Sequence, residues 1–370
     1  MNLSAEVLVG DNRKRLQELP DASVQTVVTS PPYFGLRDYG TGTWIGGDES
    51  CSHMRDSKKS DKTITGHKNF DEMLGVGDAI YKDKCPRCGA VREDEQLGLE
   101  ATPQAFVEAL CQVFDEVWRV LKDDGTIWVN LGDSYSSFRD SKAVPDSLRN
   151  GDGTAVSKAS NRNPEMLRAS GLKHKDLIGI PWRFAFAMQD RGWYLRQDII
   201  WAKPNPMPES VTDRCTKSHE YIFLMTKNPR YYYDHEAIKE DSIWANDSRA
   251  GQGRLEYDGK RQGQEGTGQE AFVTITDKKN KRDVWNVAVK SYKEAHFATY
   301  PPELITPCIL AGTKEGDLVL DPFSGSGTTG EVALQHGRNY IGLELNPDYA
   351  ELSRKRLTEA VGMFGDVTIR

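Results

Sequence analysis

Strand-like segments alternate with amphipathic helical segments along this chain, and this alternation restricts the fold more than any other feature. Residues 24–29 are mostly β-branched and apolar, which is typical of a strand buried on both faces of a parallel sheet. Residues 103–121 repeat apolar side chains at helical spacing, and a second strand is expected at residues 126–131. Strands separated by helices predict an α/β protein with a parallel sheet.

The same alternation continues to the end of the chain. Further strands are expected at residues 198–201, 221–225, 318–321 and 340–344, and helices at residues 173–190, 303–311, 328–336 and 347–360. A chain of 370 residues is long enough for two domains or for one domain with insertions. Polar stretches without periodicity interrupt the pattern, notably at residues 40–100, 136–171 and 227–284.

Composition excludes several classes of protein. The sequence contains no run of 18 apolar residues, so no transmembrane span is predicted. The N-terminal residues lack the basic and apolar regions of a secretory signal, and six cysteines are too few for a disulfide scaffold, so a cytoplasmic protein is expected. The formal net charge of −7 weighs mildly against a nucleic-acid partner, although a basic cleft is compatible with it.

A glycine-rich turn, residues 321–330, joins an expected strand to an expected helix. Its glycines allow close approach of a ligand, and the helix N-terminus favours a negative group there. With Glu344 at the end of the next strand, the pattern fits a nicotinamide site, and an ordinary turn without a ligand is the simplest alternative. Asp321 at the strand tip favours instead a cationic ligand without phosphate, such as S-adenosylmethionine.

A second motif follows the buried strand at residues 24–29. Residues 29–34 read Thr-Ser-Pro-Pro-Tyr-Phe, and two prolines cannot continue a central strand, so the chain turns there. Together with the glycine-rich turn, this motif resembles the exocyclic-amino DNA methyltransferases. The order of the two motifs is similar to that of their β-group.

This resemblance covers residues 1–40, 100–135, 172–226 and 284–360, which are expected to form one discontinuous catalytic core. It implies a Rossmann-like sheet with helices on both faces, S-adenosylmethionine as cofactor and a flipped base of double-stranded DNA as substrate. The implied catalytic residues are Ser30, Pro31, Pro32 and Tyr33. The implied cofactor-binding residues are Asp11, His296, Asp321, Phe323, Ser324, Gly325, Gly327, Thr328, Thr329 and Glu344.

Physical chemistry supports a role for the Ser-Pro-Pro-Tyr turn in such a reaction. An exocyclic amine is a poor nucleophile because its lone pair is delocalised into the base. Ser30 Oγ and the Pro31 carbonyl can accept hydrogen bonds from the amine and hold its lone pair in one direction. Tyr33 can stack on the base. In the family that the motif resembles, Ser before Pro-Pro favours N4 of cytosine, and N6 of adenine is the alternative.

Cysteine and histidine residues gather in the polar stretch 41–99, which is expected to be an insertion. Cys85 and Cys88 form a Cys-x-x-Cys-Gly knuckle, and Cys51 and His53 can supply two further ligands. Four such ligands are typical of structural zinc, and a metal explains how a stretch with so little core folds. Unrelated free cysteines, a redox pair, or His67 in place of His53 are the alternatives.

Two other stretches are expected to contact DNA, and a third is predicted only to be mobile. Trp201, Lys203 and Asn205 follow a strand near the carboxyl edge of the sheet, where they line the base pocket or hold a phosphate, unless Trp201 is simply core. Residues 136–171 are predicted to be a mobile loop, and residues 227–283 a target-recognition region. The basic run Lys278, Lys279, Lys281 and Arg282 is expected to contact phosphates, unless it is only a solvated surface.

The sequence is therefore compatible with four alternative functions. The first is a site-specific DNA amino-methyltransferase, which implies a bacterial or phage restriction-modification system with a partner endonuclease. The second is a nicotinamide-dependent oxidoreductase, which leaves the Ser-Pro-Pro-Tyr motif unused. The others are a zinc-bearing DNA-binding module without catalysis and a methyltransferase that acts on RNA or protein amines.

Overall fold

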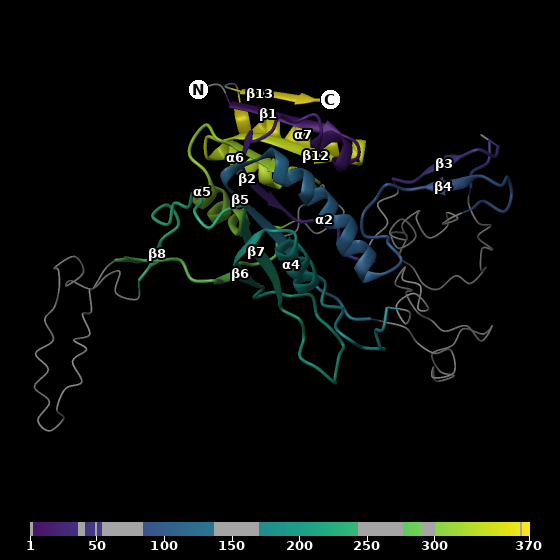
Figure 1. Ribbon diagram of the computed structural model, residues 1–370, viewed down its shortest axis with the longest axis horizontal. Coiled ribbons are helices and arrows are strands. Elements are labelled where there is room, and N and C mark those ends of the chain that lie inside the picture. Colours follow the sequence, from purple (N-terminus) through teal and green to yellow (C-terminus); the bar gives the residue numbers. More distant parts are fainter. Residues whose placement is uncertain are drawn as a thin grey trace, which may run out of the picture.

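A nine-stranded sheet forms the centre of the molecule, in the strand order β10-β6-β7-β5-β2-β11-β12-β1-β13 (Figure 1). The computed structural model describes residues 3–35, 41–48, 50–53, 84–136, 170–242, 277–290, 300–362 and 365–370. The strands of the sheet are β1 (Leu3–Val9), β2 (Val24–Thr29), β5 (Leu121–Leu131), β6 (Tyr194–Ala202), β7 (His219–Thr226), β10 (Val284–Asn286), β11 (Leu318–Asp321), β12 (Asn339–Glu344) and β13 (Gly365–Ile369).

Helices cover both faces of this sheet. They are α1 (Asn12–Leu16), α2 (Pro103–Val120), α4 (Ile180–Asp190), α5 (Pro302–Gly312), α6 (Thr328–Gln335) and α7 (Pro347–Val361). One buried cluster packs α1, α2 and α4 against the sheet, and a second packs α5, α6 and α7. The predicted α/β architecture is confirmed. Among the described helices, none has the length and apolar character that a bilayer-spanning segment needs.

The direction of β7 differs from the sequence prediction. The alternation of strands and helices predicted a parallel sheet, whereas β7 runs antiparallel to both β5 and β6. The reason lies in the connection between β6 and β7, because residues 203–218 contain no helix that could carry the chain back across the sheet. The amino end of β7 therefore lies at the same edge as the carboxyl ends of β5 and β6.

Two further differences concern element ends. Helix α4 begins at Ile180 rather than near residue 173, because Gly179 adopts a left-handed conformation (φ 79°) and Pro181 occupies the first turn of the helix. At the other end of the chain, β13 adds a parallel edge strand beside β1, which the sequence pattern did not reveal. Its alternation of half-buried and exposed residues is short and leaves little signal.

Two small sheets lie outside the central one. β3 (Thr43–Ile45) pairs with β4 (Val91–Glu93) in a hairpin that projects to the right in Figure 1. β8 (Glu240–Asp241) pairs with β9 (Lys278–Lys279). The predicted insertion, mobile loop and target-recognition region extend over residues 54–83, 137–169 and 243–276, which lie outside the described residues, so the domain boundaries stay a prediction.

The centre of the sheet brings the two sequence motifs together. β2 is buried at every position and pairs in parallel with β11, with Thr26 opposite Val319 and Val27 opposite Leu320. Neighbouring parallel strands end at the same edge of a sheet, which is where ligands bind in open α/β folds. The Ser-Pro-Pro-Tyr turn after β2 and the glycine-rich turn after β11 are therefore neighbours.

Candidate active site

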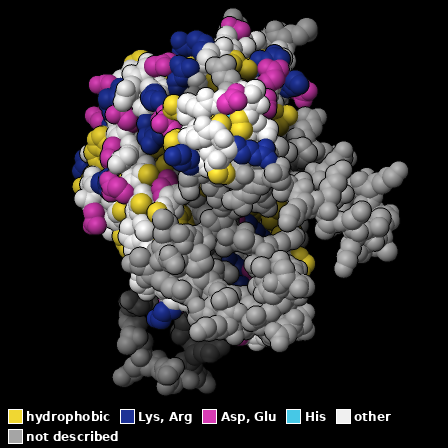
Figure 2. Space-filling model, turned by 90° about the vertical axis from the view of Figure 1, so that its right-hand side faces the viewer, with side chains coloured by type: hydrophobic (Ala, Val, Ile, Leu, Met, Phe, Trp, Pro, Cys, Tyr) yellow, Lys and Arg dark blue, Asp and Glu magenta, His cyan; other side chains and the backbone are white. Residues whose placement is uncertain are grey.

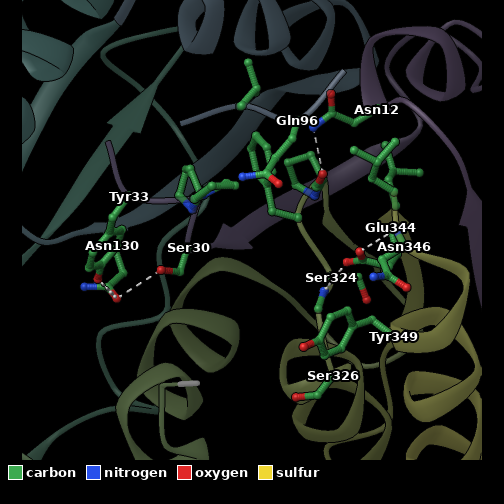
Figure 3. Close-up of a pocket in the computed structure, with 18 of the residues that line it drawn as sticks. Asn12, Ser30, Tyr33, Gln96, Asn130, Ser324, Ser326, Glu344, Asn346 and Tyr349 are labelled. Carbon is green, nitrogen blue, oxygen red and sulfur yellow. Dashed lines mark hydrogen bonds between the residues drawn. The ribbon is translucent and has the colours of Figure 1, made fainter. Parts of the chain in front are cut away.

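A cavity of about 360 Å³ opens at the carboxyl edge of the sheet, between the ends of β2 and β11. It is lined by twelve of the predicted site residues: Asp11, Ser30, Pro31, Pro32, Tyr33, Trp201, Lys203, Phe323, Ser324, Gly325, Thr328 and Glu344. Figure 3 shows Ser30 and Tyr33 on one side of the cavity, with Ser324 and Glu344 on the other. The two turns thus face each other across one space.

Asp321 does not line this cavity, although the sequence placed it against a ligand. Its carboxylate is buried and accepts hydrogen bonds from Thr29 Oγ1 (2.5 Å), Thr329 Oγ1 (2.7 Å), the Phe323 amide (3.0 Å) and the Tyr300 hydroxyl (3.2 Å). Burial raises its pKa, while the bonds from the two threonines oppose that rise. Asp321 therefore fastens the end of β2 to the glycine-rich turn, across 292 positions of sequence.

Gly327 and Thr329 also support the turn and are not among the residues that line the cavity. Gly327 has a left-handed φ of 79°, and a Cβ there would lie 2.4 Å from Ser353 Oγ in α7. The side chain of Thr329 is fully buried and bonds to Asp321. These two residues hold the glycine-rich turn against its neighbours.

Asn130, at the end of β5, orders the polar atoms of the Ser-Pro-Pro-Tyr turn. Its amide nitrogen donates to the Tyr221 carbonyl at 3.0 Å, which directs its Oδ1 toward the turn. The Ser30 hydroxyl donates to this oxygen at 3.4 Å, and the Tyr33 hydroxyl lies 3.5 Å from it (Figure 3). When the Ser30 hydroxyl donates to Asn130, the lone pairs of Ser30 Oγ are left to act as acceptors.

An ion pair stands beside Tyr33. Glu220 accepts a hydrogen bond from the Tyr33 hydroxyl at 2.5 Å and pairs with the ammonium group of Lys203. The same ammonium lies 4.1 Å from the centre of the Trp201 ring, so charge and aromatic surface meet at one wall of the cavity. Asn205 is not part of the lining. Its side-chain amide donates a hydrogen bond to the Val289 carbonyl and accepts one from the Val289 N–H.

Two carboxylates stand on the opposite side, at the ends of the neighbouring strands β12 and β1. Glu344 accepts the amide protons of Gly325 (2.8 Å) and Asn346 (2.9 Å), and burial raises its pKa to about 7. Asp11 caps α1 by accepting the Arg13 amide proton at 3.0 Å, and it pairs with the Arg13 guanidinium at 2.9 Å. Both carboxylates are thus held in place by neighbouring groups.

Comparison with known proteins identifies this arrangement. A family model described as DNA methylase matches residues 24–355, which include both turns. The chain belongs to the DNA methylase family. The resemblance to β-group amino-methyltransferases is thereby confirmed, and the dehydrogenase interpretation of the same glycines is set aside.

One relative and two solved structures show how far the similarity extends. The type II methyltransferase M.Cfr9I of Citrobacter freundii is 42% identical over 95% of this chain and 87% of its own. The cytosine-N4-specific PvuII DNA methyltransferase matches with a TM-score of 0.54 and 17% identity, covering 100% of this chain and 95% of its own. A candidate DNA modification methylase of Thermus thermophilus, complexed with S-adenosyl-L-methionine, matches with a TM-score of 0.50 and 20% identity, covering 98% and 99%. The two structures confirm the methyltransferase fold.

Sequence reasoning missed several residues that line the cavity. They include Gln96, Asn130, Glu220, Tyr300, Asn346 and Tyr349. Asn130 lies near the end of a predicted strand. The rule that ligands bind at the carboxyl edge of the sheet could therefore have predicted it as a site residue. Glu220 begins β7, and only the antiparallel direction of that strand brings it to the site. The predicted cofactor residue His296 lies outside the described residues.

The four predicted metal ligands converge in the β3–β4 hairpin. Their ligand atoms all lie within 4.8 Å of one another, with 3.7 Å between the sulfurs of Cys51 and Cys85 and 3.5 Å between Cys88 Sγ and His53 Nδ1. Zinc–sulfur bonds of about 2.3 Å and zinc–nitrogen bonds of about 2.0 Å give tetrahedral edges of roughly 3.5–3.8 Å. The two distances match these edges and the others do not exceed 4.8 Å, so the four ligand atoms are close enough to share one tetrahedral zinc ion. His67 lies outside the described residues.

The basic run is paired with acidic side chains of β8. Lys278 lies 2.5 Å from Asp241, and Glu240 pairs with Arg282 at 2.7 Å and with Lys279 at 3.4 Å. Lys281 lies 5.0 Å from the Trp285 ring. On the face shown in Figure 2, basic and acidic side chains are likewise intermixed over the described surface. Phosphate contacts by this run stay a prediction, since each contact must compete with an existing partner.

Proposed function

We propose that this DNA methylase transfers a methyl group from S-adenosylmethionine to N4 of a cytosine flipped out of double-stranded DNA. The observation that carries the proposal is the single cavity lined by both the Ser-Pro-Pro-Tyr turn and the glycine-rich turn. S-adenosylmethionine, when bound, supplies a methyl group on a sulfonium. The side chains around the cavity divide into a cofactor half and a base half.

The cofactor half suits a ligand with a ribose and no phosphate. The Glu344 carboxylate lies at the end of β12, where it can accept hydrogen bonds from two ribose hydroxyls, and it would repel a phosphate. Gly325 and Phe323 bring backbone and an aromatic face to the same side. Asp11, next along the edge, is placed for the amino group of an adenine.

The base half supplies acceptors for an amine. Ser30 Oγ and the Pro31 carbonyl accept the two amino protons, which draws the nitrogen lone pair out of the ring and aims it across the cavity. Asn130 keeps the Ser30 proton away from the amine. Tyr33 and Trp201 offer aromatic faces, and stacking of about 1–3 kcal/mol per base offsets part of the cost of flipping.

The target atom decides between two versions of this function. A neutral Ser30 before Pro-Pro favours N4 of cytosine, and N6 of adenine is the alternative. Mass spectrometry of nucleosides from DNA methylated by the enzyme distinguishes them: we expect N4-methylcytosine. Finding N6-methyladenine alone would overturn the choice of base, and unmodified DNA, with intact protein and cofactor, would overturn the function.

Cofactor affinity is expected to depend on pH through Glu344. Its pKa of about 7 without cofactor means that the carboxyl is largely protonated below pH 7. Ribose hydroxyls donate to the ionised form, so binding below pH 7 must release a proton. Affinity should therefore rise about tenfold per pH unit between pH 5 and 7 and level off above pH 7.

Calorimetry in two buffers of different ionisation enthalpy measures this proton release. Glu344→Gln is the matched variant, because it keeps the size of the side chain and removes the titration. The variant should bind with an affinity that is flat from pH 5 to 8. An equally steep pH dependence in the variant would exclude Glu344 as its source.

We also propose that Cys51, His53, Cys85 and Cys88 hold one structural zinc ion. The spacing of the four ligand atoms supports this, and their sulfurs are too far apart for a disulfide. Elemental analysis should find about one zinc per chain, and Cys88→Ser should lose it. Cys215→Ser, which changes an exposed cysteine, should keep it. A folded protein that binds no zinc would contradict the assignment.

DNA is the proposed partner, and a cognate restriction endonuclease is proposed because type II methyltransferases are among the relatives. A cytoplasmic location follows from both. The lysines and arginine of the basic run are proposed to add phosphate contacts, in which case DNA affinity falls steeply as salt rises. An affinity that does not change with salt would exclude them.

A further inference from the structure

We propose that the zinc-held hairpin positions one wall of the active-site cavity. This wall segment, residues 94–98, follows β4 directly and lies outside the stretches that resemble the methyltransferase core. Glu95, Gln96 and Leu97 line the cavity together with Ser30 and Tyr33. The inference rests on the zinc site proposed above, and it is tested separately from that site.

The four ligands lie at the loop end of the hairpin, beyond the pair Ile45 and Val91. Cys51 and His53 follow β3, while Cys85 and Cys88 precede β4. The Trp44 ring of β3 stacks on the His53 ring, with centroids 4.4 Å apart and planes at 16°. A metal that holds these ligands together therefore fixes both strands relative to each other.

Among the described residues of the hairpin, the two strands bury few side chains of their own. In β3 and in β4, the two outer residues are exposed and the middle residue is half-buried. A two-stranded hairpin with so little buried surface is at best marginally stable in water. Metal ligation closes the loop between residues 53 and 85 and supplies the missing free energy of folding. The position of β4 is thus expected to depend on the metal.

Asp94 connects the hairpin to the wall segment, so that the position of β4 determines the position of this segment. It pairs with Arg92 of β4 at 2.9 Å, with side chains only 13% and 7% exposed. Its other oxygen accepts the Thr41 hydroxyl proton at 2.8 Å and the Gln96 amide proton at 3.1 Å. Since Thr41 precedes β3, one carboxylate joins both arms of the hairpin to the wall segment.

The end of the wall segment packs directly on the Ser-Pro-Pro-Tyr turn. The Gly35 amide donates to the Gly98 carbonyl at 2.7 Å. Gly98 has a φ of 99°, and a Cβ there would lie 3.1 Å from the Tyr33 carbonyl oxygen. Leu97 is buried in the same core cluster as Phe34. Displacement of the wall segment would therefore disturb the backbone that carries Tyr33.

Gln96 is the buried polar side chain that the wall segment brings to the cavity, beside Glu95. It is 7% exposed, and Figure 3 shows it between the side of Ser30 and that of Asn12. A carboxamide both donates and accepts hydrogen bonds, as the edge of a nucleobase requires. The wall segment thus forms one side of the cavity and adds a polar group to it.

Hydrogen exchange of the full-length protein tests this inference, with zinc as the added ligand. Removal of zinc by a chelator should speed amide exchange in residues 94–98 and 33–35 about tenfold or more, and leave β12 and α7 unchanged. Cys85→Ser should do the same, whereas Cys215→Ser should behave as the parent. Restoring zinc to the stripped protein should restore slow exchange.

A second variant acts on the wall segment without touching the metal. Gly98→Ala should keep one zinc per chain, speed exchange in the same two stretches and raise KM for DNA more than it lowers kcat. A protein that binds zinc but shows unchanged exchange in residues 94–98 after stripping would overturn the positioning role and leave the zinc site intact. A folded protein that binds no zinc would overturn both.

Discussion

Ser30→Ala is expected to lower the turnover number about 10²-fold, the loss typical of removing one hydrogen-bonding group that acts on the transition state. Ser30 Oγ lies in the base half of the cavity, away from Glu344 and Ser324 in the cofactor half (Figure 3). Without the acceptor, the amine lone pair is no longer held in line with the methyl group. Single-turnover kinetics on substrate DNA measure the loss.

The matched measurement for this variant is cofactor affinity by calorimetry. It should stay within about twofold of the parent, because a group that acts only in the transition state does not change ground-state binding. Ser30→Thr keeps the hydroxyl and should recover part of the turnover number. A Ser30→Ala enzyme with full turnover would exclude Ser30 from the chemistry.

Asp321→Ala is expected to lower the free energy of unfolding by about 3 kcal/mol. Its carboxylate satisfies four donors in a buried position, and each buried donor left without a partner costs about 1–3 kcal/mol, partly recovered by relaxation. Because Asp321 joins the end of β2 to the glycine-rich turn, methyl transfer should fall as well.

Urea unfolding measures the stability change. Asp321→Asn retains one carbonyl oxygen as acceptor and should lose less than alanine does. Asp366→Ala, which removes an exposed carboxylate from β13, should lie within about 0.5 kcal/mol of the parent. A loss below about 1 kcal/mol for Asp321→Ala would show that the carboxylate does not hold the two turns together.

The sequence predicted the position of the site better than the role of each residue in it. Patterns of apolar residues located β2 and β11, and the rule that ligands bind at the carboxyl edge placed both turns there. The same reasoning put Asp321 against a ligand. A carboxylate at a strand tip has the same sequence signal whether it faces a ligand or three segments of its own chain, and only the partners Thr29 and Thr329 distinguish the two.

Glu220 shows a second limit of sequence reasoning. Its place in the site depends on the direction of β7, and strand direction is set by how the chain crosses the sheet rather than by the residues of the strand. The Cys-x-x-Cys knuckle, in contrast, was visible because its ligands are close in sequence. Its connection to the cavity was not visible, because Asp94 and Gly98 act through contacts with distant residues.

The central claim is that one cavity holds the target base and the methyl donor together. A crystal structure of the enzyme with its DNA site and S-adenosylhomocysteine tests it directly. The account predicts a flipped cytosine between Tyr33 and the glycine-rich turn, with its amino nitrogen about 3 Å from Ser30 Oγ. A target base bound outside this cavity, or a cofactor product bound away from Glu344 and Phe323, would contradict it.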